Sequence, residues 1–148
     1  MLVGVGFDNT LVCYDGIFHK IALEEQLIPE ALPKNKNAVR DYLRAAGLEP
    51  RWTEMQGLVY GSRLVEAEPY PGALEFFKTC EQNNIPVFVV SHKTQYPYLG
   101  PKYDLHEAAR GWLERYGFAS LARDVFFELT KEAKLARIGL LNCEFFLS

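Results

Sequence analysis

Polar residues that can do chemistry follow the apolar runs of this sequence. Asp8 and Thr10 come directly after the apolar run Leu2–Phe7. Ser91 closes a second run, and Lys131 stands behind a third. A carboxylate, two hydroxyls and an amine are groups that can bind and activate a phosphoryl group. Each of them alone is more typical of a turn or a helix cap, but together and in this order they predict a phosphate site.

The apolar runs have the length and composition of buried β-strands. The expected strands are Leu2–Phe7, Pro86–Val90, Val125–Phe127 and Cys143–Leu147. From about residue 69 onward, strands alternate with helices, which predicts a parallel sheet with helices on both faces. Ligands of such sheets bind at the carboxyl ends of the strands, where the polar residues described above fall.

Capping and breaking residues delimit the helices. The expected helices are Ile17–Gln26, Ala38–Ala46, Arg51–Ala67, Pro71–Cys80, Asp104–Tyr116 and Lys131–Leu141. The third is expected to be interrupted or bent near Gly57 and Gly61. The first three together predict a helical insertion after the first strand. The predicted fold class is therefore α/β, with a Rossmann-like core of residues 1–15 and 68–148 and a small helical cap of residues 16–67.

Composition restricts the classes of protein that fit. With 148 residues, of which 49% are hydrophobic, the chain can bury one sizeable core. Its net charge of -3 gives no reason to expect nucleic acid or an anionic membrane as a partner. Three scattered cysteines, a short apolar start and no apolar run near the roughly 20 residues of a membrane span predict a protein of the reducing cytoplasm.

The order of the motifs along the whole chain resembles the haloacid dehalogenase (HAD) superfamily of phosphohydrolases. Gly6–Val12 is similar to the first HAD motif, in which an apolar strand runs into Asp-x-Asp-x-Thr-Leu. Pro71-Gly72 before a helix, followed by Val87–Ser91, resembles the second motif and its approach. Thr130–Lys134 resembles the third, a lysine at a helix start, and Phe145–Ser148 resembles the start of the fourth.

The resemblance implies phosphomonoester hydrolysis through an aspartyl-phosphate, with Mg²⁺ as the cofactor and a small phosphorylated molecule or an inorganic anion as the ligand. It assigns the acid/base position, and the one carboxylate of a weak or absent metal site, to Asp8. The nucleophile position falls on Gly6. The phosphate-binding positions fall on Thr10, Ser91 and Lys131.

Two departures from the family pattern bear on activity. Gly6 has no side chain to attack phosphorus, and Ser148 stands where the acidic residues of the fourth motif should begin. They predict a phosphatase that is impaired as the chain stands, a non-catalytic anion-binding or regulatory module of the same fold, or a fragment or variant of a longer active protein. In a second register Asp8 is the nucleophile and Thr10 takes the acid/base position.

Several other residues have two possible interpretations each. Lys93 is either a phosphate ligand or a surface charge in a loop, and Lys134 is the alternative to Lys131 one helical turn further on. His92 either faces the site or has no role. The apolar segment Phe145–Leu147 predicts a homodimer, because an exposed apolar strand edge invites pairing with a second copy.

Overall fold

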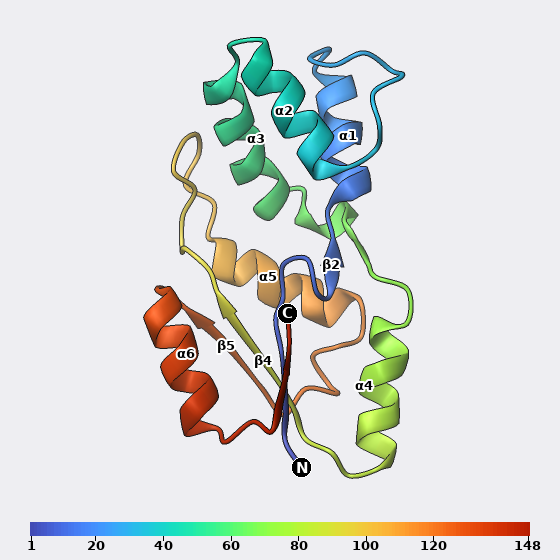
Figure 1. The fold of residues 1–148 in the computed structure, drawn as a ribbon, viewed down its shortest axis with the longest axis vertical. Helices are drawn as coiled ribbons and strands as arrows, with labels where there is room; N and C mark the ends of the chain where they lie inside the picture. Colours follow the sequence, from blue (N-terminus) through green and yellow to red (C-terminus); the bar gives the residue numbers. More distant parts are fainter.

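The apolar runs pair into a single parallel sheet in the computed structural model, which describes all 148 residues. Its strands are β1 (Val3–Val5), β4 (Val87–His92), β5 (Asp124–Glu128) and β6 (Phe145–Leu147), in the order β5-β4-β1-β6 (Figure 1). In the register, Val5 of β1 lies opposite Val89 on one side and Leu147 on the other. The prediction of a parallel sheet with the first strand in its interior is confirmed.

Three helices accompany the sheet: α4 (Ala73–Gln82), α5 (Leu105–Arg115) and α6 (Lys131–Leu140). Two of them begin after a residue whose side chain caps the helix. The Asp104 side chain accepts a hydrogen bond from the Glu107 amide at 3.0 Å, and the Thr130 hydroxyl accepts one from the Ala133 amide at 3.0 Å. These bonds satisfy amides that have no partner within the helix.

The remaining helices form a layer beyond the carboxyl end of β1 (Figure 1). They are α1 (Asp15–Glu24), α2 (Lys36–Ala45), α3 (Glu49–Tyr60) and the 3₁₀ turn η1 (Leu64–Glu66). The helix expected over Arg51–Ala67 is interrupted near Gly61, as predicted, because α3 ends there and η1 follows as a separate turn. Near Gly57 the prediction was wrong, because α3 runs through this residue unbroken. That residues 16–67 fold as a separate domain stays a prediction.

A two-stranded antiparallel ribbon joins the helical layer to the sheet. It consists of β2 (Val12–Cys13) and β3 (Glu68–Pro69), and the sequence patterns gave no sign of it. The ribbon holds both ends of the helical insertion side by side. The indole of Trp112 on α5 strengthens this junction by donating a hydrogen bond to the Ala67 carbonyl at 2.8 Å.

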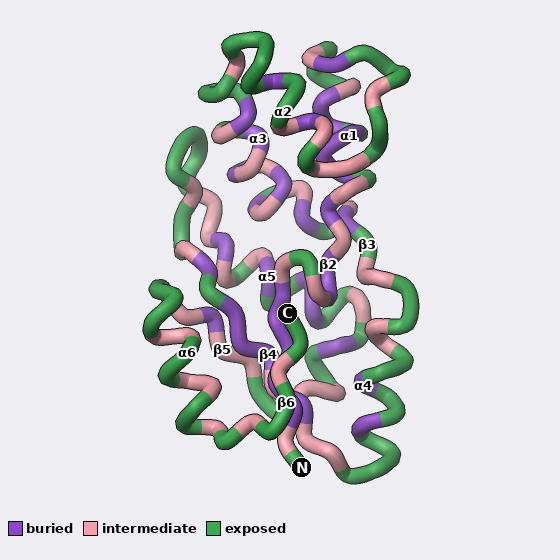
Figure 2. The backbone as a smooth tube through the Cα atoms, viewed as in Figure 1, coloured by how far each residue is buried: buried purple, intermediate pink, exposed green.

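The buried residues form one cluster that includes members of both the sheet and the helical layer. Figure 2 shows buried stretches of backbone in both parts. At its centre, the Phe7 ring meets the rings of Trp112 and Phe127 edge-on, with centroids 5.4 and 5.5 Å apart. Trp52 and Trp112 are both buried, as expected of core residues. Because the core is continuous, the helical layer and the sheet support each other through apolar packing.

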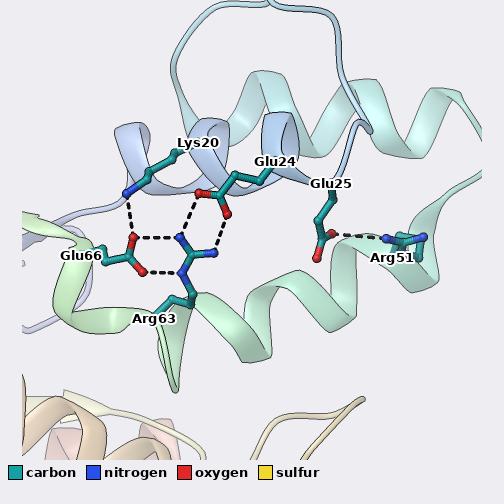
Figure 3. A network of polar contacts seen from close by, with 6 residues as sticks. All are labelled: Lys20, Glu24, Glu25, Arg51, Arg63 and Glu66. Carbon is teal, nitrogen blue, oxygen red and sulfur yellow. Dashed lines mark hydrogen bonds and ion pairs between the residues drawn. The ribbon is translucent and has the colours of Figure 1, made fainter.

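Exposed ion pairs align α1 with α3 and η1 (Figure 3). Arg63 binds Glu24 at 2.7 Å and also pairs with Glu66, which accepts from Lys20 at 2.7 Å. Exposed pairs of this kind contribute little free energy singly, about 0–1 kcal/mol each. Their effect is to fix the register of elements that the core already holds together.

The edge strand β6 leaves apolar side chains in solvent. Phe145 and Leu147 are exposed, and Phe146 is partly buried. A homodimer through this edge stays a prediction. None of the helices combines the length and the apolar character needed to cross a bilayer.

The loop after β4 packs against α3 where this helix carries glycine. A Cβ atom at Gly57 would lie 2.8 Å from Cβ of Pro97, and one at Gly61 would lie 2.7 Å from Cβ of Tyr103. The Leu105 amide donates to the Gln95 carbonyl at 2.7 Å and closes the loop. Glycine at these two positions therefore allows the loop to approach the helix closely.

Gly57→Ala should lower the stability of the protein although alanine is the better helix former. Overpacking of this kind costs about 1–3 kcal/mol. The control is Gly111→Ala on α5, where a Cβ would meet nothing within 4 Å; there we expect a gain of about 0.5–1 kcal/mol. Thermal denaturation followed by circular dichroism measures both, with roughly 2–4 °C per kcal/mol at this chain length. Equal shifts for the two variants would contradict the close packing of Pro97.

Candidate functional site

A buried ion pair lies at the carboxyl ends of β1 and β4. The Lys93 ammonium donates to both carboxylate oxygens of Asp8 at 3.1 Å. The hydroxyl of Tyr14 donates to one of the same oxygens. Asp8 therefore reaches the site as predicted, but its carboxylate already accepts hydrogen bonds from two side chains.

Lys93 is only 5% exposed, so its interpretation as a surface loop charge was wrong. The residue directly follows β4, and its amide donates to the Glu128 carbonyl at the end of β5 at 2.9 Å. Its ammonium lies over the rings of Phe7 and Tyr60, 5.2 and 5.1 Å from their centroids. A buried ammonium needs an anionic partner, and Asp8 supplies it.

A second lysine reaches the site from the helical layer. Lys36 is the first residue of α2, whose N-cap Asn35 accepts a hydrogen bond from the Ala38 amide at 2.7 Å. The Lys36 amide itself donates to the Asp15 carboxylate at 3.1 Å. These two bonds fix the start of α2 and thereby the direction from which the Lys36 side chain approaches.

The Lys36 amino group is held by aromatic residues. It donates to the Tyr60 hydroxyl at 2.7 Å and lies 5.5–5.9 Å from the ring centroids of Tyr14, Phe18 and Tyr60. Burial lowers the pKa of Lys36, and the positive charges of Arg40 and Lys93 lower it further, whereas Asp8 opposes them. Unlike Lys93, Lys36 forms no ion pair with a carboxylate.

The two tyrosines at the site remain protonated at neutral pH. Burial, followed by the negative charge of Asp8, raises the pKa of both Tyr14 and Tyr60 above the usual value for a phenol. Their hydroxyls therefore act as neutral hydrogen-bonding groups that orient Asp8 and Lys36.

These residues border a pocket of about 240 Å³. Its lining consists of Asp8, Asn9, Lys36, Tyr60, His92, Lys93, Thr94 and Leu105. Two ammonium groups face one carboxylate there, so these three groups together carry a net positive charge.

No hydrogen bond or ion pair joins the residues predicted to bind phosphate to one another. Thr10 lines a neighbouring hollow together with Leu147, and Lys131 is exposed at the start of α6. Ser91 is buried and pairs in register with Phe127, on the sheet face where Phe127 meets Phe7.

Helix α6 covers the opposite face of the sheet. There Arg137 lies over the ring of Phe126, 4.4 Å from its centroid, and Lys134 lies over that of Phe146 at 5.1 Å. The phosphate-binding role of Thr10, Ser91 and Lys131 therefore stays a prediction.

Gly6 directly follows β1, and its amide donates a hydrogen bond to the Leu147 carbonyl at the end of β6 at 2.8 Å. A Cβ atom there would be 3.1 Å from the Thr10 hydroxyl oxygen and 3.6 Å from the Leu147 carbonyl oxygen. A side chain at this position would thus start beside the Thr10 hydroxyl and the carboxyl end of β6. Glycine leaves that position without a nucleophile.

The residues present do not fit Mg²⁺, which the resemblance implies. Mg²⁺ prefers several hard oxygen ligands, usually with one or two carboxylates among them. The pocket offers a single carboxylate, that of Asp8, which Lys93 and Tyr14 already hold. Nowhere in the chain do three His, Cys, Asp or Glu side chains gather in an arrangement that could hold a metal ion.

Sequence reasoning missed three residues of the pocket or its wall, Tyr14, Lys36 and Tyr60. Lys36 belongs to the polar cluster 34–37, whose composition predicts a break before a helix beginning at Ala38. The signal that could have found it is Asn35, a favoured N-cap residue that places Lys36 in the first turn. The two tyrosines gave no signal, because their role depends on contacts with Asp8 and Lys36.

Solved structures with the same arrangement of elements come from bacterial hydrolases. A HAD-superfamily hydrolase from Ehrlichia chaffeensis is 19% identical, with a TM-score of 0.52 over 99% of this chain and 77% of its own. A predicted phosphoglycolate phosphatase from Haemophilus somnus is 14% identical, with a TM-score of 0.55 over 98% and 75%. The chain has the HAD fold. The same similarity extends to a haloacid dehalogenase-like family hydrolase from Xanthomonas campestris, which is 9% identical, with a TM-score of 0.54 over 100% and 73%.

No family model and no curated protein matches the sequence. At the identities of these solved structures, the similarity establishes the fold and not the activity. The function of this HAD-fold chain is therefore argued from its own pocket.

Removing the ammonium of the buried pair should destabilise the protein. Lys93→Met leaves the Asp8 carboxylate without its cation. Breaking a fully buried pair costs about 3–5 kcal/mol, and because the Asp8 side chain is 27% exposed we expect about 2–3 kcal/mol. Urea denaturation of this variant, of Asp8→Asn and of the double variant measures the coupling. The double variant should lose less than the two single losses combined, and strictly additive losses would contradict a direct interaction.

Proposed function

We propose that this HAD-fold chain binds a small anion, either a phosphorylated small molecule or inorganic phosphate, in the pocket between Asp8 and Lys36. We further propose that it does not turn over phosphomonoesters through an aspartyl-phosphate. The observation that carries the proposal is that Asp8 has partners within the protein whereas Lys36 has no anionic one. The carboxylate of Asp8 is held by Lys93 and Tyr14, whereas the Lys36 amino group borders the pocket with no anionic partner.

Electrostatics supports an anion as the ligand. The surrounding apolar rings reduce the local dielectric constant, so a charge at Lys36 interacts more strongly with a ligand than it would in water. An incoming anion would supply the partner that Lys36 does not have within the protein. It would also offset the repulsion between Lys36 and Lys93.

The missing turnover follows from the chemistry that Gly6 and Asp8 can offer. Attack on phosphorus needs a nucleophilic side chain that is free to react, and Gly6 has no side chain. A second candidate function is hydrolysis with Asp8 itself as the nucleophile. The position of Asp8 at the end of β1 favours this alternative. In that register the carboxylate would have to leave its bonds with Lys93 and Tyr14 before it could attack.

Anion binding should depend on Lys36. Isothermal titration with inorganic phosphate and with a generic phosphomonoester should show saturable binding to the wild-type chain. For Lys36→Met we expect a loss of about 1.5–3 kcal/mol, or roughly ten- to hundred-fold in Kd, since a charge-assisted contact is removed. The matched control is Lys131→Met, which should bind as the wild type does. If Lys131→Met loses binding and Lys36→Met keeps it, the ligand occupies the Thr10, Ser91 and Lys131 positions instead.

The unmodified chain should release no phosphate from p-nitrophenyl phosphate above background, with or without Mg²⁺. Loss of a nucleophile costs orders of magnitude in rate. Gly6→Asp should restore little, because no further carboxylates are present to hold a metal ion. Turnover that requires Mg²⁺ and disappears in Asp8→Asn would refute this proposal and support Asp8 as the nucleophile.

A further inference from the structure

A pocket larger than the one beside Asp8 lies at the other end of β4. Its volume is about 380 Å³, within the range of about 300–1,000 Å³ that is usual for small-molecule sites. Its walls come from the segment 81–86, which leads from the end of α4 into β4, and from the segment 120–123, which leads into β5. Because both segments precede strands, this pocket lies at the amino ends of β4 and β5, away from the proposed anion site.

Backbone hydrogen bonds hold the two walls in place. The Arg123 amide donates to the Val87 carbonyl at 2.7 Å, which ties the second wall to the start of β4. The Ile85 amide donates to the Cys80 carbonyl of α4 at 2.8 Å. Asn84 turns the chain in the left-handed region, with φ of 56°, which asparagine adopts more readily than most residues. The pocket is therefore a defined feature of the backbone.

The pocket is lined by one charge of each sign, and neither has a partner within the protein. Arg123 and Glu81 form no ion pair and no side-chain hydrogen bond, either with each other or with another residue. Glu81 belongs to the last turn of α4, where the partial negative charge of the helix end also favours a cation. The guanidinium of Arg123 suits a carboxylate, which it can bind through two parallel hydrogen bonds.

Much of the remaining lining is apolar. Ile85, Pro86, Leu121 and Ala122 line the pocket and are each partly exposed. A hydrocarbon group that packs against these side chains would be removed from water, which favours binding. A ligand that uses the whole lining therefore combines a carboxylate, an ammonium group and an apolar side chain.

We infer that this pocket binds a free α-amino acid with an aliphatic side chain, such as leucine. The carboxylate of the ligand contacts Arg123, its ammonium group contacts Glu81, and its side chain packs against Ile85 and Leu121. A simple anion such as phosphate would leave Glu81 unpartnered and be repelled by it, whereas a zwitterion supplies a partner for each charge. The inference does not depend on the proposed function, since the two pockets share no residue.

The test is titration of the full chain with leucine, leucinamide and isocaproate, followed by amide chemical shifts in two-dimensional NMR. Leucinamide lacks the carboxylate, and isocaproate lacks the ammonium group. Each analogue should bind about ten-fold more weakly than leucine, because a charge-assisted contact is lost. Leucine should lose its advantage over leucinamide in Arg123→Gln, and its advantage over isocaproate in Glu81→Gln. The controls Arg115→Gln and Glu75→Gln change exposed residues outside the pocket and should bind leucine as the wild type does.

Leucine should shift the amides of the segments 84–86 and 120–123 and leave those around Asp8 unchanged. The absence of saturable shifts with leucine would overturn the inference. So would isocaproate binding as tightly as leucine, which would indicate a site for an anion alone, or unchanged leucine binding in both pocket variants. Lys36→Met distinguishes the two pockets: it should bind leucine as the wild type does, and a loss of leucine binding there would assign the amino acid to the pocket beside Asp8 and refute the inference.

Discussion

The ammonium of Lys93 is the charge around which this end of the molecule is organised. A lysine that is 5% exposed cannot remain charged without a partner, and Asp8, at the end of the neighbouring strand, provides both oxygens. Because Tyr14 donates to the same carboxylate and the Tyr60 ring lies under the same ammonium, this pair also connects the sheet with the helical layer. The pair that stabilises the junction also occupies the carboxylate that an enzyme of this fold would need free.

The charged groups of the pocket come from both layers of the molecule. The sheet contributes a pair that is neutral as a whole, and α2 contributes one additional positive charge at Lys36. In the proposed function, the helical layer would therefore provide the charge that selects an anion, and the strand ends would provide a fixed wall. Asp15 and Asn35 hold the first turn of α2, so the position of Lys36 is determined by backbone contacts and does not depend on its own side chain.

The sequence alone predicted the strands of the sheet, but it did not predict the residues that form the pocket. Short apolar runs such as Leu2–Phe7, each closed by polar residues, predicted the parallel strands because runs of this length and composition are typical of buried strands. The burial of Lys93 could not be predicted, since its partner Asp8 is 85 positions away. The prediction of a bend near Gly57 failed for a similar reason: a glycine within a helix usually weakens it, and only the approach of Pro97 shows why this one is there.

The packing of the loop 95–104 on α3 bears on how fast a ligand can enter the pocket. The helical layer is attached at the β2–β3 ribbon, and Pro97 and Tyr103 hold it a second time along α3. Opening of the layer as a rigid body about the ribbon would have to separate Pro97 and Tyr103 from α3, whereas mobile lids that turn about a single hinge open on the microsecond-to-millisecond timescale. A ligand would instead reach the pocket through side-chain rotation at its rim, and its binding would be one diffusive step with no separate closure phase.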